Sequence, residues 1–235
     1  MMRNIFLICF FLLGTVPPAF AIQADALYDQ LNKKVLTVKD YTAQVKLKID
    51  VNYMRVPQLN GTMFFKSPNK MRLERKGGLS ILPKKNINLT LSNLIPTGKV
   101  AVLDQGTALY NGRKLRVLKI VPDDDQNQII LTKLWIDEDA VLVIHLETTT
   151  RNDGTIMMDM EYNNYASYAL PDKVKILLDL KDYKLPKGIT FDYDEWADTK
   201  TTKPSKSQKG TIEIFYSNYT INKGLSDLVF NKTND

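Results

Sequence analysis

Apolar and polar residues alternate along much of the chain, which predicts a protein built mainly from β-strands. The clearest case is 45–51, where Val45, Leu47 and Ile49 alternate with charged residues. A period of two places the apolar side chains on a buried face of a sheet and the charged ones on a wet face. Shorter alternating segments predict further strands near 62–65, 71–75, 99–103, 113–121, 129–136, 140–149, 155–166, 172–180, 189–197 and 210–221.

A helical period replaces this alternation near the start of the chain. Leu27, Leu31 and Val35 recur at helical spacing, and Asp25 is suited to cap the first turn. The pattern predicts a short amphipathic helix over 25–36 with one apolar stripe.

Turn sequences separate the strands. Asn111-Gly112 and the Asn-Asp-Gly sequence at 152–154 are typical of tight hairpins. The polar residues of 198–210 predict a flexible loop. Many short strands joined in sequence by such turns predict an antiparallel sheet curled into a barrel or half-barrel.

Residues 76–98 break the pattern, because they combine glycines and prolines with many leucines and isoleucines. Loops normally lie in water, so a loop this apolar is expected to bury its side chains. It either packs over the core or closes over a cavity.

Residues 1–21 have the parts of a removable export signal. Arg3 supplies the positive charge, 5–13 form the apolar centre, and Ala19 and Ala21 are the small residues that a signal peptidase reads. The apolar run is too short to span a bilayer as a permanent anchor. We expect cleavage after Ala21, with an uncleaved N-terminal anchor as the alternative.

The residue after this cut argues against a lipid tail. It is Ile22, whereas a lipoprotein needs cysteine at that position, and the only cysteine, Cys9, lies in the removed part. The remaining chain, 22–235, is therefore expected to be one periplasmic domain without a lipid anchor, a disulfide or a thiolate site.

Composition narrows the function classes. Hydrophobic residues make up 44% of the chain, which is enough for a real core. The formal net charge of +6 falls to +5 without Arg3, and an excess this mild is weak evidence about partners. The lysines alternate with apolar residues instead of clustering with aromatic ones, so we expect no nucleic-acid partner.

Candidate catalytic residues are few. His145 is the only histidine, and alternation places it on one strand face with Val141 and Val143. A histidine in such a strand is expected to have a structural role. We therefore expect no catalytic residue and no enzymatic activity.

Two acidic clusters have simple interpretations. The three aspartates at 123–125 lack the spaced oxygen ligands and the glycine of a calcium loop, so a solvated turn is expected. Asp192, Asp194 and Glu195 form either a carboxylate pair for hydrolysis or an outward polar face, and the polar face is favoured. No metal or cofactor is expected.

Apolar residues exceed what one sheet face needs, and several are methionines. Met63, Met71, Met158 and Met160 occupy candidate inward positions. Methionine is flexible and polarizable, so it suits a surface that fits variable apolar shapes. A packed core containing methionine gives the same pattern, so the residues alone leave both a core and a lipid cavity open.

Several segments, taken in order, carry a family resemblance. Residues 61–74 (GTMFFKSPNKMRLE) contain two strands joined by a proline turn, and 112–122 (GRKLRVLKIVP) form a central strand. Residues 134–137 (LWID) and 216–225 (YSNYTINKGL) come later. With the short helix and 40–45, they resemble the bacterial outer-membrane lipoprotein-sorting family, the LolA-like carriers, over nearly the whole mature chain.

The resemblance implies a fold that is mainly β with a few helices: an unclosed antiparallel half-barrel with a helical or loop lid over its concave face. It implies a soluble periplasmic carrier, without enzymatic activity, that binds the acyl chains of lipoproteins in a hydrophobic cavity and sorts them towards the outer membrane. Acylated lipoproteins or other lipids would be the cargo. An inner-membrane lipoprotein-release transporter and an outer-membrane acceptor would be the partners of a monomer.

The same resemblance suggests roles for individual residues. The expected cavity wall contains Val45, Leu47, Ile49, Met71, Leu73, Met158 and Met160. The expected lid contains Ile81, Leu82, Leu94 and Ile95. Members of the family often place an arginine directly before the turn proline to hold the lid shut, but Ser67 stands there in this chain, so Arg72 is the candidate lock.

Two other functions stay open. A lipid-binding or lipid-sensing module of the same fold would act through a protein partner. A secreted hydrolase or a structural β protein would use the same apolar residues only as a core. The long polar loop over 198–210 is not expected in the family and leaves the cargo undecided.

Overall fold

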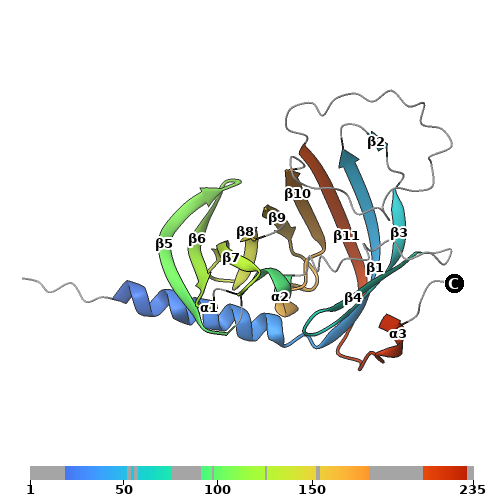
Figure 1. Cartoon of the computed structure of the whole chain (residues 1–235), viewed down its shortest axis with the longest axis horizontal. Helices are drawn as coiled ribbons and strands as arrows, with labels where there is room; N and C mark the ends of the chain where they lie inside the picture. The colour runs from blue at the N-terminus through green and yellow to red at the C-terminus, as the bar shows by residue number, and fades with distance from the viewer. Residues whose placement is uncertain are drawn as a thin grey trace, which may run out of the picture.

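The computed structural model describes residues 19–51, 54–55, 58–75, 91–96, 98–124, 126–151, 154–179 and 209–231. A single antiparallel sheet contains every described strand, in the order β4-β3-β1-β11-β10-β9-β8-β7-β6-β5, with β2 beside β1. The strands are β1 (Asp40–Val51), β2 (Met54–Arg55), β3 (Leu59–Lys66), β4 (Lys70–Arg75), β5 (Val100–Tyr110), β6 (Arg113–Pro122), β7 (Ile129–Asp137), β8 (Leu142–Thr150), β9 (Thr155–Glu161), β10 (Lys173–Asp179) and β11 (Lys209–Ile221). The sheet curls but does not close between β4 and β5, so it is an open half-barrel (Figure 1).

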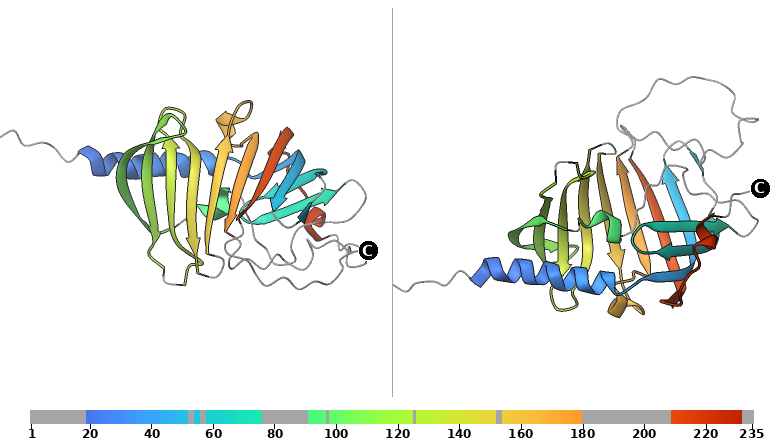
Figure 2. Two further views of the ribbon diagram at one scale, coloured as in Figure 1. Left: turned by 90° about the horizontal axis from the view of Figure 1, so that it is seen from above. Right: turned by 60° about the horizontal axis from the view of Figure 1, so that its bottom comes forward.

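The longest helix and a short helical turn lie on the inner side of this curve. Helix α1 (Ala19–Leu36) runs across the width of the sheet from beside β5 to the start of β1 (Figures 1 and 2). The single turn α2 (Leu91–Leu94) lies within the curve. A 3-10 turn, η1 (Ala166–Tyr168), connects β9 to β10, and α3 (Leu228–Asn231) packs against β4. No helix in the described ranges is long and apolar enough to cross a membrane.

The predicted half-barrel is confirmed, and β1 shows why the pattern predicted it. Tyr41, Ala43 and Val45 are buried on one face, whereas Lys46 and Lys48 are exposed on the other. The predicted helix over 25–36 is also confirmed, with α1 starting earlier. The strand predicted at 189–197, the loop at 198–208 and residues 76–90 lie outside the described residues.

Several strands differ in length from their predictions, and in β5 and β9 the reason is visible. β5 continues to Tyr110, because a bulge between Asp104 and Thr107 lets the pairing with β6 resume. Gly106 adopts φ +77° there, a conformation that suits glycine. The strand predicted at 155–166 is shorter than expected. It is β9, which ends at Glu161, because the chain then turns through η1 before β10.

The core divides into two large clusters on the inner face. The first lies under α1 and α2 and contains, among others, Leu31, Leu94, Leu118, Ile120, Leu134, Ile136, Val143, Leu146, Met158 and Met160. The second lies between β1, β3 and β4 and contains Val38, Tyr41, Ala43, Val45, Met63, Phe65, Leu73 and Leu170. A pocket lies where the two clusters meet.

Candidate lipid pocket

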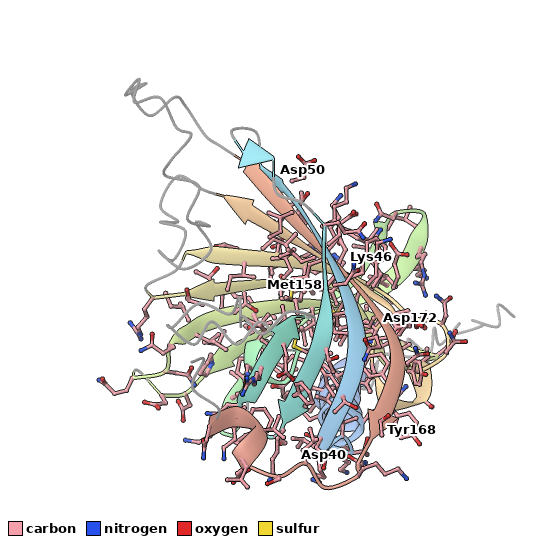
Figure 3. All side chains as sticks on the ribbon, turned by 90° about the vertical axis from the view of Figure 1, so that its right-hand side faces the viewer. Asp40, Lys46, Asp50, Met158, Tyr168 and Asp172 are labelled. Atoms are coloured by element: carbon pink, nitrogen blue, oxygen red, sulfur yellow. The ribbon has the colours of Figure 1, made fainter. Side chains whose placement is uncertain are left out.

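The pocket is a cavity of about 60 Å³ between the end of α1, the turn α2, η1 and the inner face of the sheet. Met158 lies inside the curve of the sheet, and Tyr168 lies at the end where β1 begins (Figure 3). The lining is mostly apolar and aromatic: Val35, Val38, Tyr41, Phe65, Leu91, Met158, Met160, Tyr168, Ala169, Leu170, Pro171, Val174, Tyr216 and Tyr219.

One wall is aliphatic and comes from β9 and β10. Met158 and Met160 point inward on β9, and both side chains are buried. Val174 stands directly opposite Met160 in the antiparallel register. Alternation along both strands therefore places two flexible thioethers and a branched side chain on one side of the pocket.

The facing wall is aromatic and comes from β1, β3 and β11. The rings of Tyr41 and Phe65 stack with centroids 5.1 Å apart, and Tyr219 meets Tyr41 edge-on at 5.2 Å. Tyr216 and Tyr219 stack at 5.7 Å. The hydroxyl of Tyr219 donates to the carbonyl of Pro171 at 2.8 Å, which satisfies its polar end.

This aromatic wall is uncharged. Tyrosine at its ordinary pKa is already protonated at neutral pH, and loss of hydration raises the pKa of Tyr41, Tyr216 and Tyr219 further. The pocket therefore offers ring faces and hydroxyl groups to a ligand without presenting an anion.

The place of Tyr219 in the aromatic wall was not predicted, because a bulge creates it. The β1–β11 register passes from Thr42↔Thr220 to Gln44↔Ser217, so β11 has one extra residue there. Asn218 takes φ +53° at this point. Tyr216 and Tyr219, three residues apart, consequently share a face, whereas strict alternation would separate them.

The residues predicted for the cavity wall lie on the inner face, at different distances from the pocket. Met158 and Met160 line it. Val45 and Leu73 are buried in the second cluster, and Leu47 and Met71 pack half-buried against it. Ile49 is half-buried near the end of β1, opposite Ile212. Their role in binding stays a prediction.

Of the predicted lid residues, Leu94 and Ile95 can be placed, whereas Ile81 and Leu82 lie outside the described residues. Leu94 and Ile95 are buried in the first cluster. Thr132 and Thr148 each place their hydroxyl oxygen within hydrogen-bonding distance of the Leu94 carbonyl, at 2.9 Å and 3.0 Å. This part of the expected lid is thus joined to the sheet.

Arg72, the candidate lid lock, lies on the other face of β4 from Met71 and Leu73. Its guanidinium donates to the carbonyl of Val229 in α3 at 2.7 Å. The described structure therefore places Arg72 at the junction with α3, and its predicted role towards 76–90 stays untested.

His145 does not share a face with Val143, so that prediction is wrong. The β7–β8 register passes from Ile136↔Val143 to Trp135↔His145, and the extra residue, Ile144, reverses the alternation. Val143 faces the first cluster, whereas His145 packs against Trp135 on the outer face. Residue 141 is not in the strand at all, because it occupies the preceding turn.

On the outer face His145 is fully partnered. Its Nδ1 lies 2.7 Å from Asp159 Oδ1 and 3.0 Å from the Tyr110 hydroxyl, and its Nε2 lies 3.6 Å from Glu147. Burial alone would raise the pKa of Asp159, but hydrogen bonds from His145 and Tyr110 and the charges of His145 and Lys175 lower it below its ordinary value.

The chemistry of the described residues suits apolar binding. The only histidine is stacked and hydrogen-bonded on the outer face, away from the pocket. Within the described ranges, no three His, Cys, Asp or Glu side chains converge where a metal ion could bind. The pocket itself combines thioether, aliphatic and aromatic surfaces, which recognise hydrocarbon.

Comparisons with known proteins support the fold. No family model matches the chain. No curated protein matches it either. Solved structures do: a putative outer membrane lipoprotein-sorting protein domain from Vibrio parahaemolyticus has a TM-score of 0.52 and 10% identity, covering 90% of this chain and 97% of that one.

Two further structures agree. A LolA superfamily protein from Nitrosomonas europaea has a TM-score of 0.51 and 11% identity, covering 89% of this chain and 97% of that one. A DUF1329 family protein from Desulfovibrio piger has a TM-score of 0.50 and 13% identity, covering 88% and 97%. The chain therefore has the fold of the outer membrane lipoprotein-sorting proteins, and at these identities the likeness shows the fold alone.

Proposed function

We propose that this protein is a periplasmic, non-enzymatic carrier that binds the acyl chains of lipoproteins and moves them towards the outer membrane. The observation that carries the proposal is the apolar and aromatic pocket on the inner side of an open half-barrel. An inner-membrane release transporter would load it, and an outer-membrane acceptor would unload it.

Expulsion of hydrocarbon from water supplies the binding energy. Each buried methylene contributes about 0.8 kcal/mol, so about ten buried methylenes supply about 8 kcal/mol before the cost of association is subtracted. The cavity of about 60 Å³ is too small for a long chain as it stands. Entry therefore requires lining side chains to move, and the unbranched Met158 and Met160 can change rotamer at little cost.

Export is the second part of the proposal. The signal over 1–21 would be cut after Ala21, inside the first turn of α1, which starts at Ala19. The helix would then keep 22–36, including the buried Leu27 and Leu31. The mature domain, 22–235, would be soluble and free to cross the periplasm.

Native mass spectrometry of protein purified from the periplasm, with a synthetic acylated lipopeptide added, tests the proposal. The purified mass checks the cut after Ala21, and the bound mass identifies cargo. We expect the parent to bind one lipopeptide. Met158→Gln should weaken binding about tenfold, because an amide in an apolar pocket costs about 1–3 kcal/mol when it lacks a partner.

A matched control comes from the neighbouring residue. Met157 is half-exposed on the outer face of the same strand, so Met157→Gln should leave binding unchanged. A parent that binds no lipopeptide or fatty acid, or equal weakening by both substitutions, would contradict the pocket. Binding of free lipids without lipopeptide would favour the alternative, a lipid-sensing module acting through a protein partner.

A further inference from the structure

A short segment, 91–96, stands between the pocket and the rest of the inner face. It consists of α2 and the two residues after it. Leu91 lines the pocket and packs against the first cluster, whereas Leu94 and Ile95 do not line the pocket and are buried within that cluster. The amide of Ile95 donates to the carbonyl of Leu91 at 3.1 Å, which closes the turn.

Two threonines hold this segment against the sheet. Thr132 on β7 and Thr148 on β8 stand directly opposite each other and are fully buried. They are polar residues on a face otherwise formed by leucine, isoleucine and valine. Their oxygens lie 3.0 Å apart, and both lie within 3.0 Å of the Leu94 carbonyl.

A count of protons explains the arrangement. The Leu94 carbonyl is at the end of α2, where the helix itself supplies no donor. Each threonine has one hydroxyl proton, so either both donate to the carbonyl, or one donates to it and accepts from the other. In both cases the buried carbonyl is satisfied, and losing the hydroxyls would remove the donors that the described residues offer it.

Helix α1 holds the other end of the segment. The hydroxyl of Tyr28, which is buried, donates to the carbonyl of Pro96. Hydroxyl groups from α1, β7 and β8 therefore converge on two carbonyls of a six-residue segment. Such bonds fix its position far more than apolar packing alone, because hydrogen bonds are directional.

We infer that 91–96 is a fixed partition that ends the pocket, and that Leu91 sets the length of hydrocarbon chain that the protein accepts. The inference rests on the proposed function. Beyond the partition, the inner face is filled by α1 and the fully buried Leu118, Ile120, Leu134 and Ile136. A chain that reaches Leu91 has no space ahead of it, so further methylenes stay outside.

A chain-length series tests this inference. Saturated fatty acids of increasing length are titrated against the mature protein by displacement of a fluorescent fatty acid. The parent's affinity should rise with length and then level off. Leu91→Ala removes roughly three carbon atoms from the partition. The affinity of this variant should level off at fatty acids about two carbons longer than for the parent. Over those two carbons, each added methylene should raise the affinity about fourfold, which corresponds to about 0.8 kcal/mol.

Leu91→Met provides the matched control, because it keeps the volume and should keep the parent's plateau. The double change Thr132→Val with Thr148→Val should make the affinity level off over a wider range of chain lengths. It should also speed hydrogen exchange at the Ile95 amide. Thr149→Val with Thr155→Val removes a similar pair from the outer face and should do neither.

The outcomes separate the two proposals. If the parent binds fatty acids but Leu91→Ala keeps its plateau, the partition is wrong and the carrier function stands. If the parent binds no member of the series and no lipopeptide, both proposals fall. A folding defect in the threonine variant does not affect the test. Leu91→Ala leaves the latch intact, where the latch is the set of hydrogen bonds that joins Thr132 and Thr148 to the Leu94 carbonyl.

Discussion

The inner face of the sheet differs between its two sides. On the packed side, β6 to β8, the inward residues Leu118, Ile120, Leu134 and Ile136 are fully buried beneath α1 and α2. The pocket side consists of β9, β10, β11, β1, β3 and β4, in the order of the sheet. Several inward residues there are only half-buried: Leu47, Ile49, Met71, Ile212, Ile214 and Tyr216. The same strand pattern thus builds a filled core on one side and a less completely filled surface on the other.

The difference shows how one sheet can serve both stability and binding. Hydrophobic stabilisation is proportional to the area removed from water, so the packed side supplies more of it for each residue. The pocket side keeps apolar area that a ligand can still cover. We expect substitutions on the packed side to act on folding first and those on the pocket side to act on binding first.

The largest expected effect comes from a cavity on the packed side. Leu118→Ala should lower the free energy of unfolding by about 3 kcal/mol, because the fully buried site cannot collapse around the lost side chain. Met160→Ala, beside the existing pocket, should cost about 2 kcal/mol, since fewer atoms surround it. Urea unfolding at constant m-value measures both. If both substitutions lowered the free energy of unfolding equally, the two sides would not differ in how much their buried residues stabilise the fold.

The threonine pair gives the next largest effect. Thr132→Val with Thr148→Val keeps the shape but leaves the Leu94 carbonyl unsatisfied, so unfolding should become easier by about 2 kcal/mol. The exposed pair Thr149→Val with Thr155→Val should change it by less than about 0.5 kcal/mol. Thermal and urea unfolding of both pairs provide the comparison. Equal costs would show that the buried latch adds nothing to the packed side.

Sequence patterns predicted the sheet well because most of its strands follow a strict period of two. β1, β9 and β10 each bury alternate residues, and the hairpin at Asn111-Gly112 appears where its residues require positive φ. The inward placement of Met158 and Met160 was predicted for the same reason. The alternating strands, the hairpin turn and the inward methionines depend only on residues close together in the chain, so the sequence is sufficient to predict them.

Bulges explain what the patterns missed. Ile144 in β8 and Asn218 in β11 each shift the register, which moves His145 to the outer face and brings Tyr216 and Tyr219 together. A bulge depends on the partner strand, so its effect cannot be derived from one segment. The latch between Thr132, Thr148 and Leu94 joins residues far apart in the chain and has no local signal either.

The outer face near His145 offers a smaller effect with a defined pH dependence. Asp159→Asn should cost about 1 kcal/mol at neutral pH, because hydrogen bonds to a carboxylate are stronger than those to an amide. The folded state lowers the pKa of Asp159 below 3.8, so its contribution is complete above that pH and is lost as the pH falls through the lowered value. The difference in stability between the parent and the variant should therefore shrink as the pH falls below 3.8 and disappear below the lowered pKa of Asp159. A constant difference down to pH 2 would contradict this assignment.

The smallest effect is expected on the outer face of the pocket side. Lys48 and Glu213 form an ion pair of 3.8 Å, and the Lys48 side chain is 63% exposed. Lys48→Gln should change the free energy of unfolding by less than about 0.5 kcal/mol, because water and salt screen such a pair. Urea unfolding at low and high salt checks this. A cost as large as that of Asp159→Asn would mean that an ion pair with an exposed lysine contributes as much as the hydrogen bonds of the less exposed Asp159 carboxylate. The degree of exposure would then not decide how much an outer-face charge stabilises the sheet, and burial would separate strong from weak contributions only on the inner face.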